Sequence, residues 1–116
     1  MVSRSKKQLS WALALWALSL PAMAGETLIP RSMQDKGKYY LLESKRSGNI
    51  VRAVHKRVGM DSVGYTRTEI NCKTMQIREM GYSEESVAKI AGTPTKWFEL
   101  VPGSSKSDLA YFVCKK

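Results

Sequence analysis

The first 24 residues constrain this chain most, because they have the pattern of a secretory signal and leave a short remainder to fold. A stretch with Arg4, Lys6 and Lys7 precedes the apolar run 11–20, and Pro21-Ala22-Met23-Ala24 ends in the Ala-x-Ala pattern that signal peptidases cleave. The apolar run is shorter than the roughly 20 residues of a membrane-spanning helix. We therefore predict cleavage after Ala24 and one exported domain, residues 25–116, in the periplasm, secreted or at the cell surface.

Cys72 and Cys114 are the only cysteines in the sequence. An even pair in an exported chain argues for a disulfide. A domain of about 90 residues buries only about 60–65% of its unfolded surface, so a covalent link would help to stabilise it. Closing a loop of roughly 40 residues contributes about 4 kcal/mol in the chain-entropy model. Two free buried thiols are the alternative, and the spacing of the cysteines matches no metal or redox motif.

Residues 25–82 are divided by turn signals into short segments of strand composition, which is typical of an antiparallel meander. Tyr39–Leu42 form the first such run. The segment 49–58 alternates but is apolar on both sides, which favours a central strand or a strand with a bulge. One side carries Val51, Ala53 and His55, and the other carries Ile50, Val54 and Val58.

A hairpin is predicted around Lys73-Thr74. This tip would place Cys72 opposite Met75 and create four further cross-strand pairs: Ile70 with Ile77 and Thr68 with Glu79 on a buried face, and Asn71 with Gln76 and Glu69 with Arg78 on the other. Lys-Thr lacks the Gly or Asn that tolerates positive φ in a two-residue turn, so a longer loop is the alternative.

The end of the chain has the best helix signature. Leu109, Phe112 and Val113 recur at helical spacing, Ser105 is placed to cap the helix, and Asp108 supplies the acidic position of a capping-box-like arrangement. Residues 83–94 are expected to form a loop with at most one helical turn, and 97–101 an extended segment. The predicted fold is α+β: an antiparallel β-sheet of about five or six strands with a C-terminal α-helix packed on it. A bond from Cys72 to Cys114 would pin that helix to the buried face of the hairpin.

Several short motifs in the second half form a combination that resembles the bacterial surface-adhesin protein E family. They are Gly48–Arg52, Glu69–Cys72, Arg78, Tyr82, Trp97, Pro102-Gly103-Ser104, Leu109 and Val113-Cys114-Lys115. The resemblance implies small β-rich periplasmic or surface domains whose named member is an adhesin for host plasma and matrix proteins, with haem binding and dimer formation attributed to it. That member is a lipoprotein, whereas this signal is followed by no cysteine that could carry a lipid.

Positive charge is the main candidate for a binding surface. The sequence carries 19 Lys and Arg against 10 Asp and Glu, a formal net charge of +9. A field of this sign attracts anionic partners such as lipopolysaccharide, sulfated glycans or acidic protein patches. The alternative is a solvated face that only keeps the domain in solution. The predicted binding residues are Arg52, His55, Lys56, Arg57 and Arg67, with Lys45 and Arg46 nearby.

His55 is the only histidine. A single histidine cannot form a multi-histidine metal site, and the sequence places no nucleophile or orienting carboxylate beside it for catalysis. If haem binds, His55 is the obvious axial ligand. The alternative is a histidine exposed on a strand. The five tyrosines are either a binding surface or, as is more usual in a small sheet, a cover for the core. They are Tyr39, Tyr40, Tyr65, Tyr82 and Tyr111.

Catalytic motifs are missing from the sequence: there is no Gly-x-Ser-x-Gly and no glycine-rich phosphate loop. We expect an exported, non-enzymatic binding module that engages a protein or polyanion, forms a homodimer as the resemblance implies, and contacts neither nucleic acid nor metal. A periplasmic carrier of a small ligand, with haem as the first candidate, and a periplasmic protein inhibitor are the alternatives.

Overall fold

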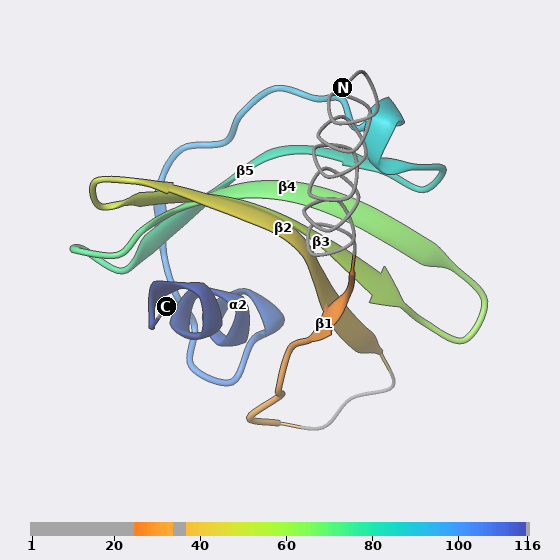
Figure 1. Ribbon diagram of the computed structural model, residues 1–116, viewed down its shortest axis with the longest axis horizontal. Helices are drawn as coiled ribbons and strands as arrows, with labels where there is room; N and C mark the ends of the chain where they lie inside the picture. Colours follow the sequence, from red (N-terminus) through yellow and green to blue (C-terminus); the bar gives the residue numbers. More distant parts are fainter. Residues whose placement is uncertain (1–24, 34–36, 116) are drawn as a thin grey trace, which may run out of the picture.

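The computed structural model describes residues 25–33 and 37–115. The predicted export signal lies outside the described residues. The described chain forms one six-stranded antiparallel sheet whose strands follow each other in chain order, with one α-helix packed on it (Figure 1). The elements are β1 (Thr27–Leu28), β2 (Lys38–Ser47), β3 (Ile50–Val58), β4 (Val63–Asn71), β5 (Gln76–Ser83), the 3₁₀ turn η2 (Val87–Lys89), β6 (Phe98–Glu99) and α2 (Ser105–Cys114). The predicted fold class is therefore confirmed.

The hydrophobic core lies between α2 and one face of the sheet. Side chains alternate along a strand, so every second residue of β3, β4 and β5 points toward the helix. Val51 and Ala53 of β3 and Ile70 of β4 are buried there against Leu109 and Val113 of α2. Ala110, Ile77, Leu41, Tyr39 and Ile29 complete this buried cluster.

The strand over 49–58 is central, as its apolar faces predicted. It is the third of the six strands, and Val54 on the face away from the helix is fully buried. The irregularity lies in its neighbour, because the register of β2 against β3 shifts between Leu41 and Glu43. Strand β3 itself alternates without a break from Ile50 to Val58.

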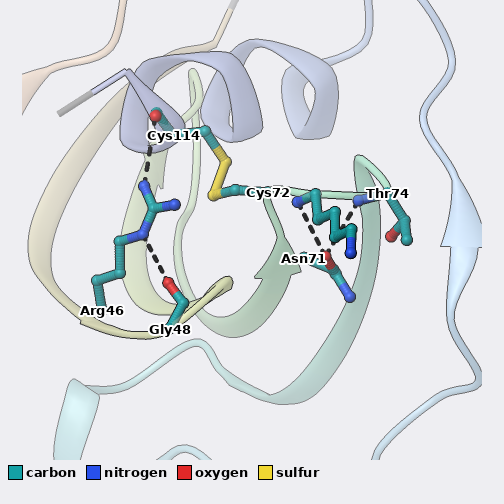
Figure 2. Close-up of a disulfide and its surroundings, with 7 residues drawn as sticks. Arg46, Gly48, Asn71, Cys72, Thr74 and Cys114 are labelled. Atoms are coloured by element: carbon teal, nitrogen blue, oxygen red, sulfur yellow. Dashed lines mark hydrogen bonds between the residues drawn. A yellow bond between two sulfur atoms is a disulfide. The ribbon is translucent and has the colours of Figure 1, made fainter.

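The β4–β5 hairpin has the predicted register, with Ile70 opposite Ile77 and Glu69 opposite Arg78. The connection is the longer alternative, a loop over residues 72–75, so Cys72 and Met75 are not ladder partners. Two features replace the missing glycine. The Asn71 side-chain oxygen accepts hydrogen bonds from the backbone N–H groups of Lys73 and Thr74 at 2.9 and 3.1 Å (Figure 2). Met75 takes the left-handed conformation at φ 57°.

A disulfide joins Cys72 in this loop to Cys114 in the last turn of α2, with the two Cα atoms 5.6 Å apart (Figure 2). The pairing confirms the prediction that the helix is fixed to the hairpin. Arg46 from β2 reinforces this end of the molecule, because its guanidinium donates to the carbonyl oxygens of Gly48 and Cys114 at 2.9 and 3.5 Å.

The start of the helix differs from the prediction by one residue. Ser104 is the N-cap, and its Oγ accepts a hydrogen bond from Ser107 N at 3.1 Å. The Pro102-Gly103 turn explains the shift, because it closes with a hydrogen bond from Ser104 N to the Val101 carbonyl and leaves Ser104 extended. Asp108 makes no capping box. Its carboxylate instead accepts from Arg31 Nε at 2.7 Å and from both Ser32 N and Oγ, which ties the N-terminal segment to the helix.

The loop predicted over 83–94 follows β5, which ends at Ser83, and it holds one 3₁₀ turn, η2, which begins at Val87. The Ser83 hydroxyl oxygen accepts hydrogen bonds from the backbone N–H groups of Glu85 and Ser86, which explains why the chain leaves β5 there as a turn. Within the described ranges, neither helical segment has the length and apolar character needed to cross a bilayer.

Candidate functional site

The predicted binding residues are divided between the two faces of the sheet. We call the side that packs on α2 the helix face and the opposite side the outer face. His55 and Arg57 share the parity of the core residues Val51 and Ala53, so they lie on the helix face. The other three, Arg52, Lys56 and Arg67, lie on the outer face. The basic cluster expected from the sequence is therefore not one surface.

Four charged residues lie side by side across the outer face. The register pairs Lys45 of β2 with Arg52 of β3, Arg52 with Glu69 of β4, and Glu69 with Arg78 of β5. We call Lys45, Arg52, Glu69 and Arg78 the cross-strand row. Because neighbouring strands are about 4.8 Å apart, the backbone positions of its basic residues are spaced at about 5 and 10 Å along a line perpendicular to the strands.

Glu69 holds the two arginines of the row in fixed positions. Its carboxylate side chain is only 8% exposed and accepts from Arg52 Nη2 at 2.7 Å and from Arg78 Nη2 at 2.8 Å. Each arginine adds a second bond through Nε, and the Arg78 guanidinium also lies 4.8 Å from the centre of the Trp97 ring. The hydrogen bonds from Arg52, together with those from Arg78, hold the pKa of the Glu69 carboxyl below its ordinary value, against the opposing effect of burial.

Three cations of the outer face that do not contact Glu69 differ in how far they are neutralised. Lys56 pairs with Glu26 and lies 5.2 Å from the Tyr40 ring centre. Lys45 is exposed and Arg67 half-buried, and neither forms an ion pair with any residue in the described ranges. The row and Arg67 together carry four positive charges and one negative charge. One end of the row borders a hollow of about 360 Å³ next to the β2–β3 turn.

A second hollow, also of about 360 Å³, lies on the helix face beyond the start of α2. The helix covers the apolar half of this face, and the other half is polar and open. Its lining comes from β2, β3, the β3–β4 connection, β4, β5 and the first turn of α2: Tyr39, His55, Arg57, Ser62, Gly64, Thr66, Glu79, Tyr82, Ser105 and Lys106. We call it the helix-face hollow.

His55 lines this hollow and is 9% exposed. Its Nδ1 is sealed from solvent and has no hydrogen-bond partner among the residues that the structure describes. Burial lowers the pKa of His55 from 6.5 to about 4; the positive charge of Lys106 acts in the same direction, and Glu79 opposes it weakly. The imidazole is therefore neutral at pH 7, and it is not the exposed strand histidine that was the sequence-based alternative.

The charged groups around His55 are held by partners. Lys106 Nζ lies 2.8 Å from a Glu79 carboxylate oxygen, and Arg57 Nε donates to the Tyr39 hydroxyl at 3.0 Å. Gly64 leaves room for the Tyr82 ring, since a Cβ at Gly64 would lie 2.5 Å from the Tyr82 hydroxyl oxygen. Tyr82 is 48% exposed and forms an outer wall of the hollow.

The tyrosines serve both purposes that the sequence left open. Tyr39 belongs to the core, Tyr40 and Tyr65 are half-buried, and Tyr82 and Tyr111 are exposed. The residues that sequence reasoning missed are mainly Glu79, Thr66 and Lys106. The predicted hairpin register placed Glu79 opposite Thr68 and was a usable signal for the first. No sequence signal placed Lys106 near His55, because the helix packing brings them together.

The helix-face hollow does not fit haem. A haem macrocycle is a broad apolar plate that needs apolar walls on both sides of an accessible axial nitrogen. Here the groups around His55 are hydroxyls, one carboxylate and two cations, and one ring nitrogen is sealed from solvent. Comparison with known proteins gives no further guidance, because no protein family, no curated protein and no solved structure matches this chain.

Proposed function

We propose that the mature chain is an exported, non-enzymatic binding module of the surface-adhesin E type that engages a polyanionic glycan through the outer face of its sheet. The observation that carries the proposal is the cross-strand row, in which three cations from three different strands share one line with a single, fully engaged carboxylate. Repeated sulfate or phosphate groups on a polysaccharide are the anions that such a line matches best.

The geometry of Glu69 supports this proposal. The carboxylate uses Nε and Nη2 of each arginine, so the Nη1 side of the Arg52 guanidinium, on a side chain that is 59% exposed, stays available for an oxyanion. Side chains that are already fixed lose little entropy when they bind, which favours affinity. Lys45 and Arg67 add positive charge, and neither forms an ion pair with a described carboxylate.

The disulfide between Cys72 and Cys114 supports the exported location, because such bonds persist in oxidising compartments. The neutral, buried state of His55 supports a binding role over catalysis, since the imidazole forms no hydrogen bond, in the described residues, with a hydroxyl group that it could activate. The proposal thus places the domain in the periplasm or on the cell surface, where it meets charged glycans.

The test uses heparin, a sulfated polysaccharide, as the probe. Replacing Lys45 and Arg67 together by Ser removes two charges without breaking a described ion pair, and we expect binding about tenfold weaker or more, with a flatter dependence on salt. The matched control replaces Lys38, at the other end of β2 from Lys45, and Lys115, after the last residue of α2, by Ser. It removes the same charge away from the row and also breaks no described ion pair. Equal losses in both variants would show a response to net charge alone and would overturn the proposal. Binding to an acidic protein but not to heparin would replace the glycan by a protein partner.

A further inference from the structure

We propose that the helix-face hollow is a second binding site, separate from the cross-strand row, and that it takes a small hydroxylated monocarboxylate of the sugar-acid class. Its volume of about 360 Å³ lies within the range of sites for small molecules, about 300–1,000 Å³. Five elements that are distant in the sequence contribute its lining, and nearly all of the lining is able to form hydrogen bonds.

His55 is the first reason to assign a ligand to this hollow. A side chain that is more than nine-tenths buried normally has its polar atoms paired, yet His55 forms no hydrogen bond within the described residues. With Nδ1 sealed from solvent, Nε2 is the ring nitrogen that the hollow can reach. A neutral imidazole that keeps its proton on Nε2 presents an N–H donor to a bound oxygen atom and avoids burying an unpaired N–H at Nδ1.

The start of α2 is the second reason. Ser105 and Lys106 are the first two residues of this ten-residue helix, and both line the hollow. Backbone N–H groups in the first helical turn have no partner inside the helix, and the helix dipole favours an anion there. The ammonium group of Lys106 adds a full positive charge at the same place. Together with Nε2 of His55, these donors surround a position suited to a carboxylate.

The charge balance and the hydroxyl groups define the ligand class. Arg57 and Lys106 bring two positive charges and Glu79 one negative charge, so the hollow carries one net positive charge while His55 is neutral. A single carboxylate neutralises it. The Glu79 carboxylate can accept hydrogen bonds from hydroxyl groups of the ligand, and Thr66 can donate to them or accept from them. A hydroxylated monocarboxylate satisfies all of these groups, whereas a bare inorganic anion would leave Glu79 without a hydroxyl donor.

The test follows the proton NMR signals of His55, which is the only histidine in the sequence and therefore needs no assignment if the chain is purified without a histidine tag. Gluconate is the probe, with glucose as the uncharged control and sulfate, which has no hydroxyl group at neutral pH, as the control for a bare anion. We expect gluconate to shift the His55 signals saturably at up to about 10 mM. The bound anion should also raise the pKa of His55 above about 4, because it stabilises the imidazolium form.

Variants test whether the carboxylate of gluconate binds next to Lys106. Lys106→Gln should weaken gluconate binding about tenfold, and the double variant Lys106→Gln with Glu79→Gln, which removes the unpaired carboxylate as well, should not restore it. Lys89→Gln is the matched control and should bind as the parent does. The Lys45 and Arg67 double variant should also keep gluconate binding, which separates this site from the one proposed for the outer face.

Three results would overturn the proposal. They are no shift of the His55 signals with gluconate up to about 10 mM, an equal shift with glucose, and unchanged gluconate affinity in Lys106→Gln. A stronger effect of sulfate than of gluconate would reject the ligand class. If Lys106→Gln does not fold, the titrations of the parent chain still decide between these outcomes.

Discussion

The two faces of the sheet differ in how far their buried polar and charged side chains are hydrogen-bonded. On the outer face, Glu69 is buried but fully engaged by Arg52 and Arg78, and the surplus is positive charge. On the helix face, His55 is buried with an unpaired nitrogen beside an open hollow. A satisfied network makes a rigid platform, whereas on the helix face Nδ1 stays unpaired inside the protein and Nε2 is the ring nitrogen left for a ligand in the hollow.

Removing the disulfide should have the largest effect, because it fixes α2 over the helix face. Replacing Cys72 and Cys114 by Ser should lower the free energy of unfolding by about 4 kcal/mol. Urea denaturation measures this loss, and Lys73→Ser in the same loop is the control, expected to stay within about 0.5 kcal/mol. Ligand binding at the helix-face hollow should also weaken when the helix is less firmly held, since Ser105 and Lys106 line the hollow. A loss below about 1 kcal/mol would show that packing alone holds the helix.

The second largest effect should be a loss of stability in acid, which is caused by the buried His55. The pKa of His55 is depressed to about 4 in the folded state, so between about pH 6.5 and 4 the unfolded chain binds a proton that the folded chain does not. The free energy of unfolding is therefore unaffected by protonation of His55 above pH 6.5. It decreases as the pH falls below this value, by about 3 kcal/mol at pH 4. Denaturation of the parent and of His55→Gln over this range measures it. The same slope in both proteins would contradict the buried, neutral histidine. Glu69 and Asp108 also have depressed pKa values, and their contributions disappear at lower pH, below the ordinary range of carboxyl groups.

The cross-strand row should show a smaller effect on stability and an opposite effect on binding. Glu69→Gln removes the carboxylate that Arg52 and Arg78 share and should lower the free energy of unfolding by about 2 kcal/mol. The affinity for heparin should rise, because the competing negative charge is gone. Glu99→Gln, an exposed partner of Gln76 next to the row, is the control and should change stability by less than about 0.5 kcal/mol. Weaker heparin binding in Glu69→Gln would mean that fixed arginine positions matter more than net charge.

Only part of the candidate site could be predicted from the sequence, and the two faces of the sheet show the reason. Alternation within β3 and the β4–β5 register could be read from the sequence, so the pairing of Glu69 with Arg78 was predicted. The part of the row contributed by Lys45 was not, because the shift in register between Leu41 and Glu43 decides which residue of β2 lies opposite Arg52. The basic residues from 52 to 57 were expected on one surface, but neighbouring positions on a strand point to opposite faces.

The sequence by itself determined the antiparallel meander, the terminal helix and the two cysteines that join them, because these depend on local periodicity, turn residues and composition. Only the tertiary structure decided where the helix stops covering the sheet. That boundary depends on the disulfide at one end of α2, on the Pro102-Gly103 turn and the Ser104 cap at the other, and on the bond of Asp108 to Arg31. It leaves His55 buried beside a polar hollow and brings Lys106 next to it, a meeting of residues about 50 positions apart that no local pattern encodes.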